Sequence, residues 1–307
     1  MKIAIIGTGG VGGYFGGKLA NARCDVTFLA RGEHLKALQL NGLIVKSIKE
    51  SFHVKPIKVT DKIKDIGKTD LIILAVKAWQ VKDIAKDLLE DIHDDTVILP
   101  LQNGVLAIDE LKESLNAKNI IGGLCRIISK IESPGIINHF GINPTIVFGE
   151  LDNKKTNRVQ KIKELFDIAG INSKIADDIQ SELWKKFIGI CVSGLLAVTR
   201  TTYGEVRELK ETLALMRELL YEIYVLSQKI GINIEPDFLE KTISYIDSFP
   251  YDSTSSLTRD VWEGKPSEIE YQNGTVVRLG EKYGIETPVN RFIYNCILPM
   301  ELKARKL

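Results

Sequence analysis

The chain has 307 residues, of which 44% are hydrophobic and 26% charged, and its 41 basic against 40 acidic residues give a formal net charge of +1. This length exceeds what a single core usually covers, so we expect two domains, and the apolar fraction excludes a disordered chain. The balanced charge excludes a protein held on nucleic acid or on an acidic membrane surface by its overall field.

The chain also lacks sequence signals for membranes, metals and secretion. Its best apolar run, Ile188–Val198, is shorter than the roughly 18–20 residues that a membrane helix needs. The four cysteines show no CxxC spacing and the four histidines show no ligand spacing, so we expect no disulfide framework and no metal site. The N-terminus has no signal-peptide pattern. The sequence therefore predicts a soluble cytoplasmic protein with no nucleic-acid or membrane partner.

Short apolar runs alternate with helical patterns in the first half of the chain. Runs rich in Ile, Val and Leu predict buried strands at Ile3–Ile6, Val26–Leu29, Leu71–Val76, Val97–Leu99 and Ile120–Gly122. Segments with helical periodicity separate several of them, including Val81–Leu89 and Ala107–Leu115. This alternation indicates βαβ units and a parallel sheet.

The pattern changes around the turn signal Pro134-Gly135. Cys125–Ile131 and Ile136–Phe140 flank this signal and predict an antiparallel hairpin. We expect three further elements after it: a strand at Thr145–Phe148, a helix at Lys161–Ala169 and a strand at Asn172–Ile175.

Only helical patterns follow from about Asp178 onward. One predicted helix face runs from Leu209 to Ile223 and another from Ile269 to Tyr283, the latter behind a helix-starting proline at Pro266. We therefore expect an α/β fold with a Rossmann-type dinucleotide-binding domain over residues 1–176 and an all-helical domain over residues 177–307.

The first predicted strand runs directly into a glycine-rich loop. Its residues are Gly7, Thr8, Gly9, Gly10, Val11 and Gly12, which form a G-x-G-x-x-G motif between a strand and a helix. Such glycines allow a tight turn and the close approach of a pyrophosphate, and the helix N-terminus attracts its charge. The alternative is a glycine-rich turn without a ligand. The context of the motif favours a dinucleotide site.

The end of the second predicted strand indicates which nucleotide is bound. An NAD site usually has an acidic residue there, but this strand is followed by Arg31, with Lys36 close behind. A guanidinium would pair with the 2′-phosphate of NADP(H), which a carboxylate would repel. We therefore expect NADP(H), the alternative being a solvated surface arginine.

Two more polar positions follow predicted strands, where open α/β sheets bind ligands. Lys77 follows Leu71–Val76, and Asn103 follows Val97–Leu99. Either residue could contact a cofactor or substrate. Equally, Lys77 could be a solvated helix start and Asn103 a turn residue ahead of a glycine.

Lys186 lies on a predicted helix beside small residues, whereas Lys185 points away from the apolar face of that helix. A lysine beside apolar surface and a gap can have a lowered pKa and act as a general acid or base. The alternative, which geometry alone favours, is a lysine whose stem packs along a helix contact. Near the C-terminus, the cluster from Ser253 to Thr258 and Glu268 fit simple helix capping.

Taken together, these segments resemble the ketopantoate reductase (2-dehydropantoate 2-reductase) family almost end to end: GTGGVGGYFGGKLA, VKAWQ, LQNGV, ELWKKF, and SSLTRD followed by EIEYQNG. The resemblance implies NADPH-dependent reduction of 2-dehydropantoate to pantoate, in pantothenate and coenzyme A biosynthesis. It implies that Lys186 is the general acid, that Glu268 supports it, and that Ser256 binds the substrate carboxylate. It further implies that Lys77, Asn103 and Glu268 contact the cofactor, and that Asn103 and Lys186 contact the substrate.

Three positions depart from the family pattern: Ile190, Gly194 and Tyr203 stand where asparagines are typical. A 2-keto acid with a less polar tail is therefore an alternative substrate. The same fold would also suit a related Rossmann dehydrogenase for a hydroxy acid or opine, or a non-catalytic NADP(H)-binding regulatory protein. Apolar stretches of the helical domain are compatible with a homodimer.

Overall fold

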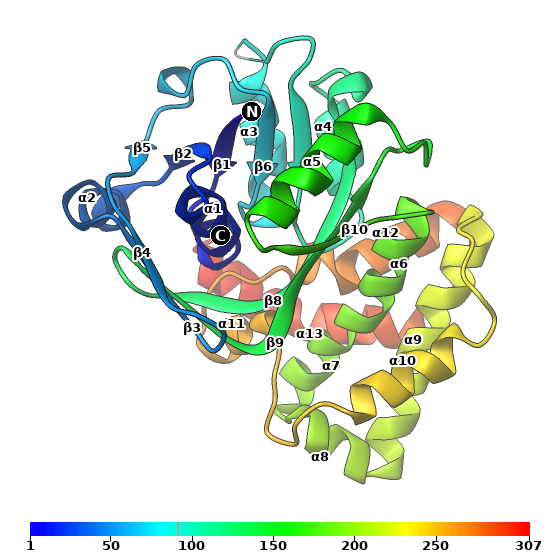
Figure 1. The fold of residues 1–307 in the computed structure, drawn as a ribbon. Coiled ribbons are helices and arrows are strands. Elements are labelled where there is room, and N and C mark those ends of the chain that lie inside the picture. The colour runs from blue at the N-terminus through cyan, green and yellow to red at the C-terminus, as the bar shows by residue number, and fades with distance from the viewer. Residues whose placement is uncertain (91) are drawn as a thin grey trace. The chain divides into compact units, whose positions relative to one another are not determined.

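The computed structural model describes residues 1–90 and 92–307, which divide into two units (Figure 1). The first unit comprises Met1–Gln102 and Leu106–Ile179, and the second comprises Asn103–Val105 and Gln180–Leu307. The sequence places the domain boundary between residues 176 and 177. It does not indicate that the short segment Asn103–Val105 belongs with the helical unit.

Five parallel strands form the first sheet of the first unit, in the order β5-β2-β1-β6-β7. Their bounds are Lys2–Ile6 for β1, Asp25–Leu29 for β2, Lys58–Thr60 for β5, Leu71–Leu74 for β6 and Val97–Pro100 for β7. The central strand β1 pairs with β2 on one side and β6 on the other, so that Ile3 lies opposite both Val26 and Leu71. This sheet confirms the predicted Rossmann-type fold class.

A second sheet has the order β10-β9-β3-β4, with β8 paired to β9. Its strands are Leu43–Ser47 (β3), Phe52–Val54 (β4), Gly122–Ser133 (β8), Ile136–Gly149 (β9) and Asn172–Ile175 (β10). The antiparallel pairing of β8 with β9 confirms the predicted hairpin.

The bounds of two predictions in this region need correction. Ile136–Phe140 and Thr145–Phe148 are parts of the single strand β9, because the pairing with β8 continues through a register shift. Ile120–Gly122 is not a strand of the parallel sheet. Ile120 forms only an isolated bridge with Ile98, and Gly122 already begins β8.

The helices of the first unit are Gly10–Asn21 (α1), Gly32–Asn41 (α2), Val81–Leu88 (α3), Ala107–Lys112 (α4) and Asn157–Ile168 (α5). Short 3₁₀ turns lie at Ile63–Asp65, Ala78–Gln80 and Ala117–Asn119. The helix predicted at Lys161–Ala169 corresponds to α5, which begins earlier in the chain.

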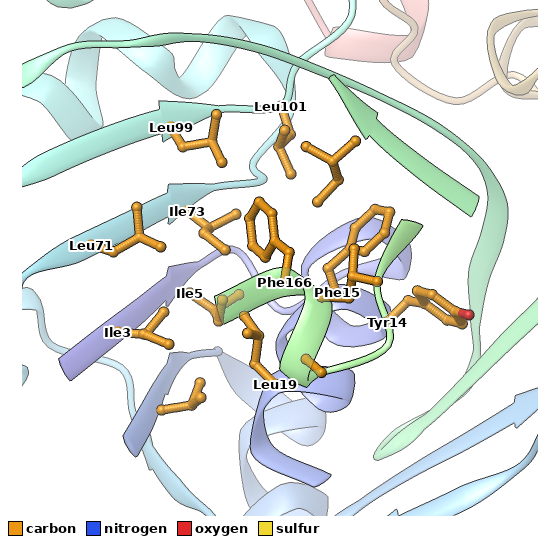
Figure 2. Close-up of a cluster of buried hydrophobic side chains, with 14 of the residues drawn as sticks. Ile3, Ile5, Tyr14, Phe15, Leu19, Leu71, Ile73, Leu99, Leu101 and Phe166 are labelled. Atoms are coloured by element: carbon orange, nitrogen blue, oxygen red, sulfur yellow. The ribbon is translucent and has the colours of Figure 1, made fainter. Parts of the chain in front are cut away.

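Helix α1 lies between the two sheets (Figure 1). A Cβ added at Gly16 would meet Ile5 and Phe28 of the first sheet at 2.7 Å, whereas one at Gly13 would meet Ile137 of the second sheet at 2.6 Å. Glycines therefore let both sheets approach the helix closely. Its larger side chains Phe15 and Leu19 enter the core beside β1 (Figure 2). Strands of both sheets therefore pack against α1, the helix that follows the glycine loop.

The second unit is helical. Its elements are Ile179–Ile190 (α6, which begins in the first unit), Val192–Thr199 (α7), Tyr203–Glu208 (α8), Lys210–Ile230 (α9), Phe238–Asp247 (α10), Ser256–Trp262 (α11), a 3₁₀ turn at Ile269–Tyr271, Asn273–Tyr283 (α12) and Pro288–Arg305 (α13). The predicted apolar face from Leu209 to Ile223 corresponds to α9. Among the described residues, the structure has no helix with the length and apolar character needed to span a membrane.

The prediction of one helix over Ile269–Tyr283, started by Pro266, is wrong. The chain forms a 3₁₀ turn over Ile269–Tyr271, and Gln272 then adopts φ −114° and ψ −104° before α12 begins at Asn273. The apolar spacing of three and four residues fits this arrangement as well, because a 3₁₀ turn repeats every three residues. Glu268 therefore precedes a tight turn rather than a long helix.

Candidate active site

The glycine loop connects β1 to α1. Gly7 has φ +97°, and a Cβ there would lie 2.9 Å from the backbone of Ala75, so the tight turn requires glycine. Thr8 anchors the loop, because its N–H and its hydroxyl both donate to Leu29 O, at 3.2 and 2.9 Å. The loop is thus fixed to the carboxyl ends of β6 and β2.

The three motif glycines have different surroundings. A Cβ at Gly12 would lie 2.1 Å from Gly7 O, so this glycine permits contact between helix and loop, whereas a Cβ at Gly9 would meet nothing within 4 Å. The first bond of α1 runs from Gly13 N–H to Gly9 O, which leaves the N–H groups of Gly10, Val11 and Gly12 without acceptors inside the helix. Open space beside free N–H groups fits a dinucleotide pyrophosphate.

Arg31 lies two residues beyond β2 and caps the N-terminus of α2 with extended backbone. Its side chain is exposed, and within residues 1–90 and 92–307 it has no hydrogen bond or ion pair. The neighbouring Lys36 instead pairs with Glu33 at 2.7 Å on the same helix. Arg31 is therefore the cation at this strand end that remains available for a phosphate.

Lys77 follows β6 and is exposed, with its ammonium 5.6 Å from the centre of the Trp79 ring. The buried Gln102, which follows β7, donates from Nε2 to Leu74 O and Val76 O at 2.9 and 3.2 Å. Gln102 thereby fixes the chain just before Lys77. Sequence reasoning missed this role, although the residue belongs to the LQNGV segment.

Asn103, Lys186 and Glu268 come together in the second unit. Lys186 Nζ donates to Asn103 Oδ1 at 2.9 Å, and Asn103 Nδ2 donates to Glu268 Oε2 at 3.0 Å. Glu268 is 5% exposed, so its carboxyl group lies largely out of water. A lysine, an amide and a carboxylate from three distant segments therefore form one hydrogen-bonded chain.

The geometry distinguishes the two adjacent lysines of α6. Lys185 pairs with Glu235 at 2.6 Å and its ammonium lies 5.8 Å from the Phe238 ring centre. Lys186 instead reaches Asn103. Periodicity separated these side chains, and the structure places them with different partners.

Close packing brings Asn103 next to Glu268. Gly104 has φ +93°, and a Cβ there would lie 2.7 Å from Tyr271 O in the turn that follows Glu268. A larger residue at position 104 would push the Asn103 segment away from this turn. Gly104 thus allows the approach that the hydrogen bond between Asn103 and Glu268 requires.

The structure shows the surroundings of all three atypical positions. A Cβ at Gly194 would lie 2.4 Å from Asn273 Oδ1 and 2.7 Å from Ile293 Cγ2, so the packing of α7 leaves no room for a side chain. Tyr203 is 6% exposed and packs edge-on against Phe249. Burial raises the pKa of Tyr203 to about 12, although a hydrogen bond with Ser193 acts in the opposite direction. Ile190 is half-buried and packs against the helical core.

The hydroxyl cluster caps α11, as predicted. Ser255 Oγ accepts from Thr258 N–H at 3.1 Å, and the Thr258 hydroxyl donates to Ser193 O at 2.9 Å. Ser256 is the exposed first residue of this helix. For the part of the chain that the structure describes, no group of three or more His, Cys, Asp or Glu side chains is placed to hold a metal.

Known proteins resemble this chain over both units. Models described as "Ketopantoate reductase PanE/ApbA" and "Ketopantoate reductase PanE/ApbA C terminal" match residues 3–153 and 178–301. A 2-dehydropantoate 2-reductase of Nostoc sp. is 30% identical over 96% of this chain and 93% of its own. The structure of a PanE/ApbA family ketopantoate reductase from Ralstonia eutropha JMP134 is 27% identical, covers 99% of this chain and 100% of its own, and has a TM-score of 0.91.

A further structure shares the fold at lower identity. D-mandelate dehydrogenase, in a ternary complex with NADH and anilino(oxo)acetate, is 24% identical, covers 99% of both chains and has a TM-score of 0.90. The family models and the relative that is 30% identical together cover nearly the whole chain. The chain therefore belongs to the ketopantoate reductase family.

Proposed function

We propose that this protein is an NADPH-dependent oxidoreductase that reduces the C2 carbonyl of a 2-keto acid, with 2-dehydropantoate as the first candidate substrate and pantoate as its product. This reaction would serve pantothenate and coenzyme A biosynthesis. The observation that carries the proposal is the hydrogen-bonded chain of Lys186, Asn103 and Glu268. Family membership supports the reaction class.

The residues of the first unit fit the cofactor. The free N–H groups of Gly10, Val11 and Gly12 would bind the pyrophosphate, and the open space beside Gly9 would let it approach. Arg31 would pair with the 2′-phosphate. We assign Lys77 to the same cofactor because it follows the strand next to β1. When bound, NADPH supplies the hydride that reduces the carbonyl carbon.

Lys186 would donate the proton. Reduction of a carbonyl turns its oxygen into an alkoxide, and a positioned ammonium both stabilises that charge and protonates the oxygen. Asn103 fixes the direction of the ammonium by accepting one of its three N–H bonds. An ammonium held in this direction would donate to the substrate oxygen through another of its N–H groups.

Glu268 would support this acid. Its carboxylate accepts from Asn103 Nδ2, which fixes the amide so that Oδ1 faces Lys186. The exposed Ser256 hydroxyl is our candidate for the substrate carboxylate.

Steady-state kinetics tests this proposal. The purified protein is mixed with NADPH and each member of a 2-keto acid panel, and NADPH absorbance is followed. We expect turnover with 2-dehydropantoate and a lower kcat/KM with NADH in place of NADPH. NADPH binding without turnover across the panel would instead favour a regulatory role.

A second candidate is a 2-keto acid with a less polar tail. Gly194 has no side chain, Tyr203 is buried against Phe249, and Ile190 is apolar. These positions therefore lack the side-chain amide groups that asparagines would place there. The matched pair 2-dehydropantoate and 3,3-dimethyl-2-oxobutanoate, which differ only in one hydroxyl, distinguishes the candidates. A site that binds the hydroxyl should reject the analogue by about 10⁴-fold or more in kcat/KM. A preference for the analogue would identify the less polar substrate class.

A further inference from the structure

Ser267, the residue before Glu268, is held from both sides by α13. Glu301 accepts from Ser267 N–H, with its two oxygens at 3.2 and 2.9 Å, and from the Ser267 hydroxyl at 2.7 Å. Arg305 Nη2 donates to Ser267 O at 3.1 Å. Both peptide groups of Ser267 are therefore bound, including the one that continues into Glu268.

The Glu301 carboxylate is itself well supported. It is 3% exposed, Ser267 is fully buried, and Arg305 Nε donates to Glu301 Oε1 at 2.5 Å. A buried carboxylate with a charged partner and three further hydrogen bonds is a stiff contact, because breaking it leaves an uncompensated buried charge. The same helix thus supplies both the anion and the cation that hold this segment.

We infer that Glu301 is a positioning residue, which holds the Ser267–Glu268 backbone so that the Glu268 carboxylate meets the Asn103 amide. Glu301 is connected to Lys186 through Ser267, Glu268 and Asn103, each linked to the next by a hydrogen bond or a peptide bond. The catalytic consequence rests on the proposed function. The positioning itself does not, because the hydrogen bond between Asn103 and Glu268 joins two residues of this chain.

The test compares Glu301→Gln with Glu222→Gln. Glu222 is a matched control, since it is also buried and also binds α13, but at the other end of that helix, where it accepts from Val289 N–H and Asn290 N–H at 2.8 and 3.0 Å. Both variants lose a buried charge that holds α13. Only Glu301→Gln alters the contact with the residue before Glu268, because the glutamine NH2 group would face either Ser267 N–H or Arg305 Nε, both of which are donors.

The first readout is the side-chain amide signal of Asn103 in NMR spectra of ¹⁵N-asparagine-labelled full-length protein, assigned by its absence from Asn103→Asp. We expect Glu301→Gln to shift this signal and Glu222→Gln to leave it in place. The second readout is kcat per folded protein on the best keto acid of the panel. We expect it to fall roughly 10- to 100-fold in Glu301→Gln, since small misplacements of catalytic groups have effects of this size, and to stay near wild type in Glu222→Gln.

An Asn103 signal that stays in place in Glu301→Gln, or a kcat equal to that of Glu222→Gln, would overturn the inference. If Glu301→Gln cannot be purified, Ser267→Ala replaces it. This variant removes the hydroxyl contact with Glu301 and a long hydrogen bond from Ile269 N–H, but keeps the contact between Glu301 and Ser267 N–H. It should change both readouts less than Glu301→Gln does, and no change in either readout would also overturn the inference. If the wild-type protein reduces no keto acid, the proposed function fails. The amide signal alone then decides whether Glu301 positions Glu268.

Discussion

The Lys186 ammonium donates to Asn103 Oδ1 at 2.9 Å, although the two residues lie 83 positions apart in the chain. Asn103 is part of a three-residue segment that belongs with the helical unit, while the chain on both sides of it belongs with the α/β unit. The lysine therefore contacts a residue that lies three positions after the end of β7. This contact makes Lys186 rather than Lys185 the residue to test.

Lys186→Ala should lower kcat by about 10²–10⁴-fold, because the alkoxide loses a positioned proton donor. NADPH binding should persist, since the glycine loop is unchanged. The matched control is Lys185→Ala, which removes an ion pair with Glu235 on the same helix and should leave kcat within about 2-fold. Steady-state kinetics of both variants on the best substrate provides the measurement. A Lys186→Ala enzyme with near-wild-type kcat would contradict the general-acid role.

Two alanine substitutions in the glycine loop should change different properties of the protein: one should weaken NADPH binding, and the other should destabilise the fold. Gly9→Ala adds a Cβ in open space, so the free energy of unfolding should change little, while the Kd for NADPH should rise about 10-fold or more as the pyrophosphate loses its close approach. Gly12→Ala would place a Cβ 2.1 Å from Gly7 O and should destabilise the fold by about 1–3 kcal/mol. Urea denaturation and NADPH titration separate the two. Equal effects of both substitutions on NADPH binding would argue against a pyrophosphate at Gly9.

Local patterns in the sequence predict part of this structure. The strands β6 and β7, and β1 from Ile3 onward, are buried, continuous apolar runs. The G-x-G-x-x-G motif identifies the loop between β1 and α1. The helical period of 100° per residue also separates Lys186 from Lys185, because it depends only on neighbours along one helix.

Other features depend on contacts between distant residues, which no local pattern shows. β4 and β5 have three residues each and are half-exposed, so they lack a long apolar run, and pairing with neighbouring strands stabilises them. The bonds from Asn103 to Glu268 and from Ser267 to Glu301 span 165 and 34 positions. The resemblance to a family supplied Glu268, but no sequence signal indicated Glu301.

Acid should destabilise the first unit partly through His34. Its ring accepts a hydrogen bond from Gly135 N–H at Nδ1, 3.1 Å away, and the ring must be neutral to do so. Burial lowers the pKa of His34 below its usual 6.5, and a hydrogen bond with the Thr8 backbone opposes this shift in part. The unfolded chain then binds this proton at a higher pH than the folded chain does. The stability contribution is therefore complete above about pH 6.5 and is lost as the pH falls through the lower, folded pKa.

His34→Asn removes the titratable ring but keeps a hydrogen-bond acceptor near the position of Nδ1. The free energy of unfolding, measured with urea at about pH 7.5 and about pH 5, should fall less in this variant than in the wild type. The same fall in both proteins would show that His34 does not contribute to acid sensitivity.

Arg31→Ala should change the choice of cofactor. The guanidinium is exposed and, within the chain as described, has no ion pair to break, so its loss should leave the free energy of unfolding within about 0.5 kcal/mol. A charge-assisted bond to a 2′-phosphate contributes about 1.5–3 kcal/mol, so KM for NADPH should rise roughly 10- to 100-fold, while KM for NADH, which lacks that phosphate, should stay within about 2-fold. Lys36→Ala is the control, because Lys36 already pairs with Glu33 and should affect neither cofactor strongly. Steady-state kinetics with both cofactors tests whether Arg31 binds the 2′-phosphate. An equal rise in both KM values would mean that Arg31 contacts a part common to the two nucleotides. A wild-type preference for NADH would contradict a 2′-phosphate site.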